Sequence, residues 1–98
     1  MKVIYVGFPK TGTKTMAEAF RILGLNCYDF MENYEDLGDD WMRILTQGGR
    51  AEDFKMMYKD VDAVTDIPCC YFWEELLQAF PEAKVIKCYF FIVIIIIP

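Results

Sequence analysis

Residues 3–15 read Val3-Ile4-Tyr5-Val6-Gly7-Phe8-Pro9-Lys10-Thr11-Gly12-Thr13-Lys14-Thr15, and this stretch decides the fold of the chain. Its first four residues are apolar and mostly β-branched, which is typical of a buried strand. A loop rich in glycine, lysine and threonine follows, and residues 16–25 are then compatible with a helix. A strand, a short loop and a helix in this order place backbone N–H groups at a helix N-terminus, where they can hold an anion. The stretch therefore predicts binding of a phosphate or a phosphate-like group.

The side chains of this loop suit the same purpose. Pro9 fixes the backbone before the turn, and the two glycines allow conformations that a side chain would block. Lys10 and Lys14 add positive charge, and the threonine hydroxyls add hydrogen-bond donors. The candidate anion-binding residues are Pro9, Lys10, Thr11, Gly12, Thr13, Lys14 and Thr15.

The loop differs from that of the nucleotide triphosphatases, whose pattern is G-x-x-x-x-G-K-[ST]. Gly7 and Gly12 have the required separation, but Thr13 stands where the lysine belongs and Lys14-Thr15 comes one residue late. No apolar strand ends in an aspartate that is clearly a magnesium ligand, which ATP and GTP sites need. A P-loop nucleotide kinase or NTPase is therefore an alternative that matches the loop only in part.

Strands alternate with helices along the chain. We expect strands at residues 2–6, 61–65 and 84–86, a short strand or extended turn at residues 27–30, and helices at residues 14–24, 35–47, 51–59 and 70–80. The apolar positions expected to face the core include Ala17, Phe20, Ile22 and Leu23 in the first helix, and Leu37, Trp41, Ile44 and Leu45 in the second. This alternation predicts an α/β fold, a parallel sheet with flanking helices.

Composition restricts the class of protein. The 98 residues suffice for one small domain or part of a larger one, and a net charge of −5 with no basic stripe argues against a nucleic-acid partner. The four cysteines, Cys27, Cys69, Cys70 and Cys88, form no C-x-x-C pattern, so we expect buried, reduced thiols and a cytoplasmic location. The N-terminus does not read as a signal peptide. The sequence does not predict the oligomeric state.

The phosphate-binding stretch resembles the 5′-phosphosulfate loop of the sulfotransferases, whose usual form is P-K-[ST]-G-[TS]-[TS] after the first strand. Three further segments are similar to P-loop sulfotransferase-like proteins, namely FRILGL (20–25), VDAVTDIP (61–68) and YFWEEL (71–76). The resemblance covers about residues 1–86. It implies a topology like that of the nucleotide kinases, 3′-phosphoadenosine 5′-phosphosulfate (PAPS) as donor, and no metal requirement.

The resemblance also implies roles for single residues. Lys10 matches the loop lysine that contacts the phosphosulfate, and Asp66 matches a catalytic base at a strand end followed by x-Pro. A carboxylate there could take the proton of an acceptor hydroxyl. The alternative for Asp66 is structural: it caps the following helix or accepts hydrogen bonds from loop amides. Lys14 is either an additional anion contact or a solvated helix residue.

Residues 87–98 depart from the family pattern. After Lys84-Val85-Ile86 the family continues to an arginine that binds the 3′-phosphate of PAPS, but here Phe90 stands near that position in an isoleucine-rich run. We interpret residues 1–86 as the N-terminal part of a sulfotransferase-like domain with a truncated sheet, and residues 87–98 as an apolar tail. The run is too short to span a membrane as a helix and reads as a strand, although contact with a membrane surface is conceivable.

The function expected from these observations is sulfuryl transfer from PAPS to a hydroxyl or amine of a small-molecule or glycan acceptor, impaired in this form because the 3′-phosphate site is missing. The alternatives are the kinase or NTPase fragment and a non-catalytic interaction protein with a membrane-associating tail.

Five aromatic residues are candidates for the acceptor pocket, with core packing as the competing role: Trp41, Phe54, Tyr71, Phe72 and Trp73. The acidic cluster at Glu32, Glu35, Asp36, Asp39 and Asp40 is expected to be a solvated face and helix start.

Overall fold

One sheet organises the chain, with its strands in the order β2-β3-β1-β4-β5. The computed structural model describes residues 1–7, 12–89 and 92–96, and side chains as far as residue 88. The strands are β1 (Val3–Val6), β2 (Cys27–Tyr28), β3 (Ala63–Val64), β4 (Lys84–Tyr89) and β5 (Ile92–Ile96). The helices are α1 (Thr13–Ile22), α2 (Phe30–Gln47), α3 (Ala51–Met57), the 3₁₀ turn η1 (Cys69–Phe72) and α4 (Trp73–Ala79).

The first four strands are parallel, which confirms the predicted α/β fold. β1 lies between β3 and β4, with Val3 opposite both Ala63 and Lys84. β5 pairs antiparallel with β4, with Val85 opposite Ile96 and Tyr89 opposite Ile92. The apolar tail thus supplies β5, one of the two edge strands of the sheet.

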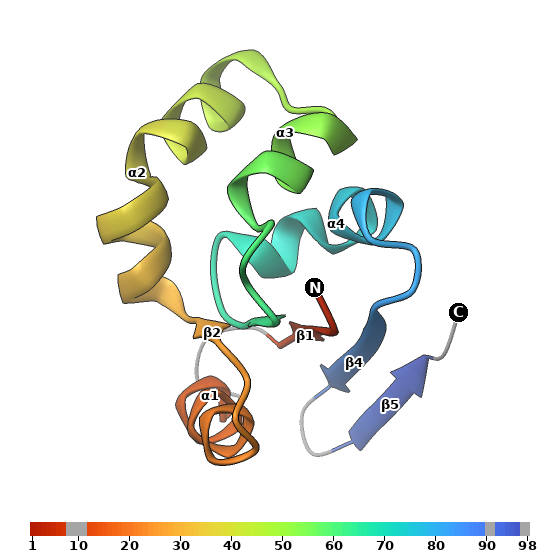
Figure 1. Cartoon of the computed structure of the whole chain (residues 1–98). Coiled ribbons are helices and arrows are strands. Elements are labelled where there is room, and N and C mark those ends of the chain that lie inside the picture. The colour runs from red at the N-terminus through yellow and green to blue at the C-terminus, as the bar shows by residue number, and fades with distance from the viewer. Residues whose placement is uncertain (8–11, 90–91, 97–98) are drawn as a thin grey trace.

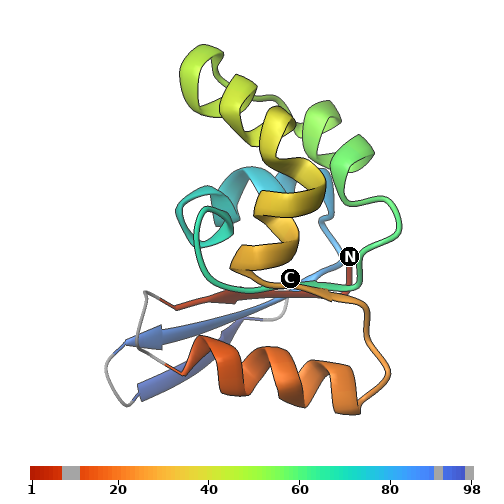
Figure 2. The same cartoon turned by 90° about the vertical axis from the view of Figure 1, so that its left-hand side faces the viewer.

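Helices cover both faces of the sheet (Figures 1 and 2). α1 lies alone beneath it in Figure 2, and α2, α3 and α4 lie above it. Successive residues of a strand point to opposite faces, so Ile4 packs under α2 to α4 while Tyr5 packs against α1. The larger core contains Ile4, Trp41, Ile44, Phe54, Tyr58, Val61, Val64, Cys69, Leu76, Ala79, Ala83 and Val85. The smaller core contains Tyr5, Ala17, Phe20, Cys27, Ala63 and Cys88.

Several element boundaries differ from those predicted. α2 begins at Phe30 rather than residue 35, because Asp29 and Glu32 form a capping box that satisfies the first turn. β3 has two residues rather than five, since backbone pairing with β1 involves only Ala63 and Val64. The predicted helix at 70–80 starts as the 3₁₀ turn that follows Pro68, and becomes α-helical at Trp73.

Three residues predicted to face the core are exposed: Ile22, Leu23 and Leu45. Gly24 has a left-handed conformation directly after α1, and Ile22 and Leu23 lie at the end of the helix, beyond the buried Phe20. Leu45 follows Ile44 and points away from the core that Ile44 enters. Ala17, Phe20, Trp41 and Ile44 are buried as expected.

A buried polar cluster joins α2, α3 and η1. The Tyr58 hydroxyl donates to Asn33 Oδ1 and accepts from Trp41 Nε1 at 2.9 Å. The same hydroxyl lies 3.3 Å from the thiol of Cys69. All four side chains are almost fully buried, so the polar groups that meet at the Tyr58 hydroxyl depend on one another for hydrogen-bond partners. Tyr58 is the centre of this cluster.

Replacing Tyr58 with Phe should lower the free energy of unfolding by about 1–3 kcal/mol, because Asn33 and Trp41 lose a buried partner. Tyr34→Phe is the matched control, since Tyr34 is 68% exposed. Urea unfolding followed by circular dichroism measures both. Equal stabilities of the two variants would contradict the role of this cluster.

Stability should also fall at alkaline pH. Burial raises the pKa of the Cys27 thiol from 9.0 to about 11 and that of Cys69 to about 12. The unfolded chain therefore releases these protons first, so stability is full below about pH 9 and declines as pH rises toward the folded-state values. Urea midpoints at pH 7.5, 9 and 10.5 test this, and Cys27→Ala should flatten the decline. A constant midpoint over this range would contradict it.

Candidate functional site

The chain reverses its direction across the sheet at the edge strand β2, so the connections that leave the adjacent strands β1 and β3 run in opposite directions. From β1 it passes through α1 to the edge strand β2, and then returns through β3 toward β4. Right-handed crossovers require the connecting helices to change faces when the direction reverses, and the helices do so (Figure 2). The segments that follow β1 and β3 consequently leave the sheet toward opposite faces. A crevice forms at such a point, at the carboxyl ends of the strands, and ligands bind there in open parallel sheets.

The first side of this crevice is the N-terminus of α1. Gly12 occupies the N-cap position with φ of 85° and no side-chain cap, and the first turn contains no acidic residue. Thr13 is buried, whereas Lys14 and Thr15 are exposed. The candidate residues Pro9, Lys10 and Thr11 lie outside the described residues. The described part of the predicted anion site thus provides N–H groups and positive charge without an opposing carboxylate.

The second side is the segment after β3, which contains Asp66. This residue has φ of 64°, an uncommon conformation for a residue other than glycine. Its carboxylate accepts a 2.8 Å hydrogen bond from the N–H of Ile67, so the loop-amide role foreseen for it is present. Burial, together with the negative charge of Asp66, raises the pKa of the neighbouring Cys70 thiol. Asp66 itself is half-buried.

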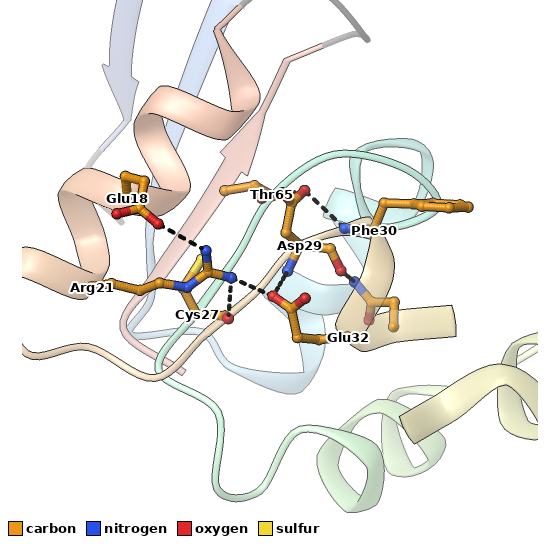
Figure 3. A network of polar contacts seen from close by, with 8 residues as sticks. Glu18, Arg21, Cys27, Asp29, Phe30, Glu32 and Thr65 are labelled. Atoms are coloured by element: carbon orange, nitrogen blue, oxygen red, sulfur yellow. Dashed lines mark hydrogen bonds and ion pairs between the residues drawn. The ribbon is translucent and has the colours of Figure 1, made fainter. Parts of the chain in front are cut away.

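Thr65, directly before Asp66, is anchored to the start of α2 (Figure 3). The fully buried Thr65 donates from its hydroxyl to Asp29 Oδ1 at 3.1 Å, and the same oxygen accepts from the N–H of Phe30 at 2.8 Å. Glu32 accepts from the N–H of Asp29 and from Arg21 of α1. Arg21 also donates to the carbonyl of Cys27 at 3.3 Å. This network connects α1, β2, α2 and the segment that carries Asp66.

Cys69 anchors the other end of the same segment through Tyr58, as described above. Asn33, the partner of Tyr58, donates to the carbonyl of Asp29 at 2.9 Å and so links the two networks. Asp66, Ile67 and Pro68 are therefore held between two anchored neighbours. Asp29 was foreseen only as part of an extended turn, although the Asp29-x-x-Glu32 spacing is a capping signal in the sequence. The roles of Asn33 and Tyr58 have no such signal, because they arise from tertiary contact.

A pocket of about 610 Å³ lies beside this segment. It is lined by Phe30, Asn33, Tyr34, Glu35, Gly38, Asp39, Trp41, Met42, Leu45, Ile67 and Pro68. Of the five aromatic residues predicted as pocket candidates, only Trp41 lines it. Phe54 and Phe72 pack against Trp41 in the core, Trp73 lies under the ammonium of Lys87, and Tyr71 is exposed.

Two other features of the described residues bear on the predicted functions. No group of three or more His, Cys, Asp or Glu side chains is placed to hold a metal ion among the residues searched. In the same part of the chain, none of the helices has the length and apolarity that crossing a membrane demands.

Comparison with known proteins identifies relatives of the chain. A protein family described as "Sulfotransferase domain" matches residues 2–89. The chain is also 38% identical over 95 residues to a protein of Aspergillus versicolor named "Ava biosynthesis cluster protein M". That match covers 88% of this chain and 36% of the relative, so the chain spans about a third of the relative's length.

The anchoring of Thr65 can be tested with a double-mutant cycle. Asp29→Ala should lower the free energy of unfolding by about 1–2 kcal/mol, because α2 loses its N-cap and the buried Thr65 hydroxyl loses its acceptor. Thr65→Val in that background removes the orphaned hydroxyl and should be less costly than in the wild type. Urea unfolding of the four proteins gives the coupling energy. Additive effects would show that the two side chains do not support each other.

Proposed function

Because the chain belongs to the sulfotransferase domain family, we propose that it binds PAPS at the N-terminus of α1 and contributes to sulfuryl transfer to a hydroxyl or amine acceptor. One observation carries the proposal. The N-terminus of α1 and Asp66 follow adjacent parallel strands, β1 and β3, whose onward connections run in opposite directions across the sheet. Neighbouring strands lie about 4.8 Å apart, so an anion held after β1 and a base after β3 would be within reach of one acceptor atom.

The residues present fit an anionic donor. The first-turn N–H groups of α1 have no side-chain cap, and Lys14 in that turn is exposed. When bound, PAPS supplies the activated sulfuryl group. Lys10 and the N–H groups of residues 11–15 would hold the 5′-phosphosulfate, and Lys10 would stabilise the charge that develops on the departing oxygen. Thr13, which is buried, would fix the first turn of the helix against the sheet.

Asp66 would act as the general base. Its anchored segment restricts the carboxylate to one region of the crevice, and such restriction favours proton transfer from an acceptor hydroxyl. The hydrogen bond from the N–H of Ile67 uses one carboxylate oxygen and leaves the other to accept the proton. In this arrangement the structural and catalytic roles of Asp66 are compatible.

Donor binding is the direct test, and it does not require turnover. Isothermal titration of the full chain with PAPS should show binding that Lys10→Ala weakens about tenfold or more, because a charge-assisted contact contributes about 1.5–3 kcal/mol. Lys55→Ala removes the same charge from the exposed surface of α3 and is the matched control. Asp66→Asn should leave PAPS affinity unchanged while lowering any transfer rate.

Two results would contradict the proposal. The first is equal PAPS affinity of the Lys10→Ala and Lys55→Ala variants. The second is magnesium-dependent ATP binding in the absence of PAPS binding, which would favour the nucleotide kinase or NTPase alternative that the Gly7 to Gly12 spacing leaves open.

A further inference from the structure

The pocket beside Ile67 and Pro68 owes its shape to an interruption in α2. Leu37 has φ of −125° and ψ of 18°, which are not helical values, so the helix bends there. Gly38 follows and lines the pocket without a side chain. A Cβ added at Gly38 would meet no atom within 4 Å, so the space above this glycine is open. The protein's own packing therefore does not require glycine at this position.

The walls of the pocket are mainly aromatic and aliphatic. Phe30 and Tyr34 stack with ring centroids 6.2 Å apart and interplanar angle 19° on one side. Trp41, Met42 and Leu45 continue the lining along α2, and Tyr34, Met42 and Leu45 are each at least 60% exposed. Such apolar walls suit the body of a small organic molecule.

Two carboxylates lie in this apolar lining. Glu35 and Asp39 lie on either side of the bend at Leu37, and both line the pocket and are exposed. The other acidic residues of α2 have partners: Glu32 pairs with Arg21, Asp36 interacts with the Tyr28 hydroxyl, and Asp40 pairs with Arg43. Within the described part of the chain, Glu35 and Asp39 form no ion pair. Among the acidic residues of α2, the two carboxylates without such a partner in the described residues therefore both line the pocket.

The pocket also has a fixed place relative to the proposed reaction. Phe30 follows β2 and Ile67 follows β3, while the anion site follows β1, and these strands are neighbours in the order β2-β3-β1. Pocket, Asp66 and anion site therefore lie in sequence along the carboxyl edge of the sheet. A molecule in the pocket would extend past Ile67 toward Asp66 and the donor.

From these observations we propose that the pocket binds the acceptor, and that the acceptor is an aromatic or aliphatic amine carrying a positive charge. This inference rests on the proposed function, since it identifies the substrate class of the same site. The apolar walls hold the body of the molecule, and Glu35 and Asp39 attract its ammonium group.

Tyramine and 4-ethylphenol are suitable probes, because they share a phenol and differ by the ammonium group. Binding to the full chain, measured by saturation-transfer NMR, should be several-fold tighter for tyramine. Glu35→Gln and Asp39→Asn should each reduce tyramine affinity about two- to fivefold and leave 4-ethylphenol unchanged, consistent with exposed charge pairs of up to about 1 kcal/mol. Glu82→Gln, which removes an exposed carboxylate outside the pocket, should change neither.

Gly38→Leu tests the location independently of charge. It adds a side chain where a Cβ meets no atom within 4 Å, and it replaces glycine by a better helix former, so both probes should lose binding while the melting temperature stays equal or rises. Unchanged binding in this variant would overturn the pocket assignment. Equal affinity for the two probes would overturn the cationic class.

The remaining outcomes separate this inference from the proposed function. Failure of both probes to bind, with PAPS binding intact, would overturn the acceptor pocket alone. Concentration-dependent dimerisation in sedimentation that Leu45→Glu abolishes would assign the surface to a second copy of the chain and would also overturn it. Failure of PAPS to bind, with tyramine binding intact, would contradict the donor site and leave the pocket standing.

Discussion

The reversal of chain direction at β2 sends the connections of the adjacent strands β1 and β3 in opposite directions, and the rest of the structure depends on this constraint. Parallel strands joined by right-handed crossovers can reverse only by placing helices on opposite faces, which separates the segments after β1 and β3. The crevice between them is therefore a consequence of topology, and it forms whatever side chains occupy it. The sequence determines its chemistry by placing a glycine-capped helix without acidic residues on one side and Asp66 on the other.

The segment that carries Asp66 needs additional polar contacts because the left-handed backbone conformation of Asp66 is energetically unfavourable. A left-handed conformation costs an ordinary residue about 1–2 kcal/mol, and such a conformation persists where neighbouring contacts determine it. Thr65 and Cys69 supply these contacts, on either side, through Asp29 and Tyr58. The two partners are themselves joined through Asn33. A single polar network thus fixes the end of β3, the start of α2 and the position of the candidate base.

Sequence reasoning could predict what depends on local pattern. The run at 3–6 and the alternation of strands and helices predicted the parallel sheet, and the Thr65-Asp66-x-Pro68 segment placed Asp66 at a strand end. The apolar pattern gave wrong burial predictions where contacts between distant segments determine which side chains are buried. Ile22 and Leu45 have apolar side chains at helical spacing, but their exposure depends on where each helix leaves the sheet or the core. The bend at Leu37, and with it the pocket, could not be predicted because periodicity continues through it.

Charge is distributed unevenly between the two helices proposed to carry binding sites, α1 and α2. The net charge is −5, yet the first turn of α1 has no acidic residue and five carboxylates lie on α2, on the opposite face of the sheet. Interactions between exposed charges are screened beyond about 8 Å at physiological ionic strength. An anion bound at α1 would therefore respond mainly to charges near that helix N-terminus, and a cation in the pocket would respond mainly to Glu35 and Asp39.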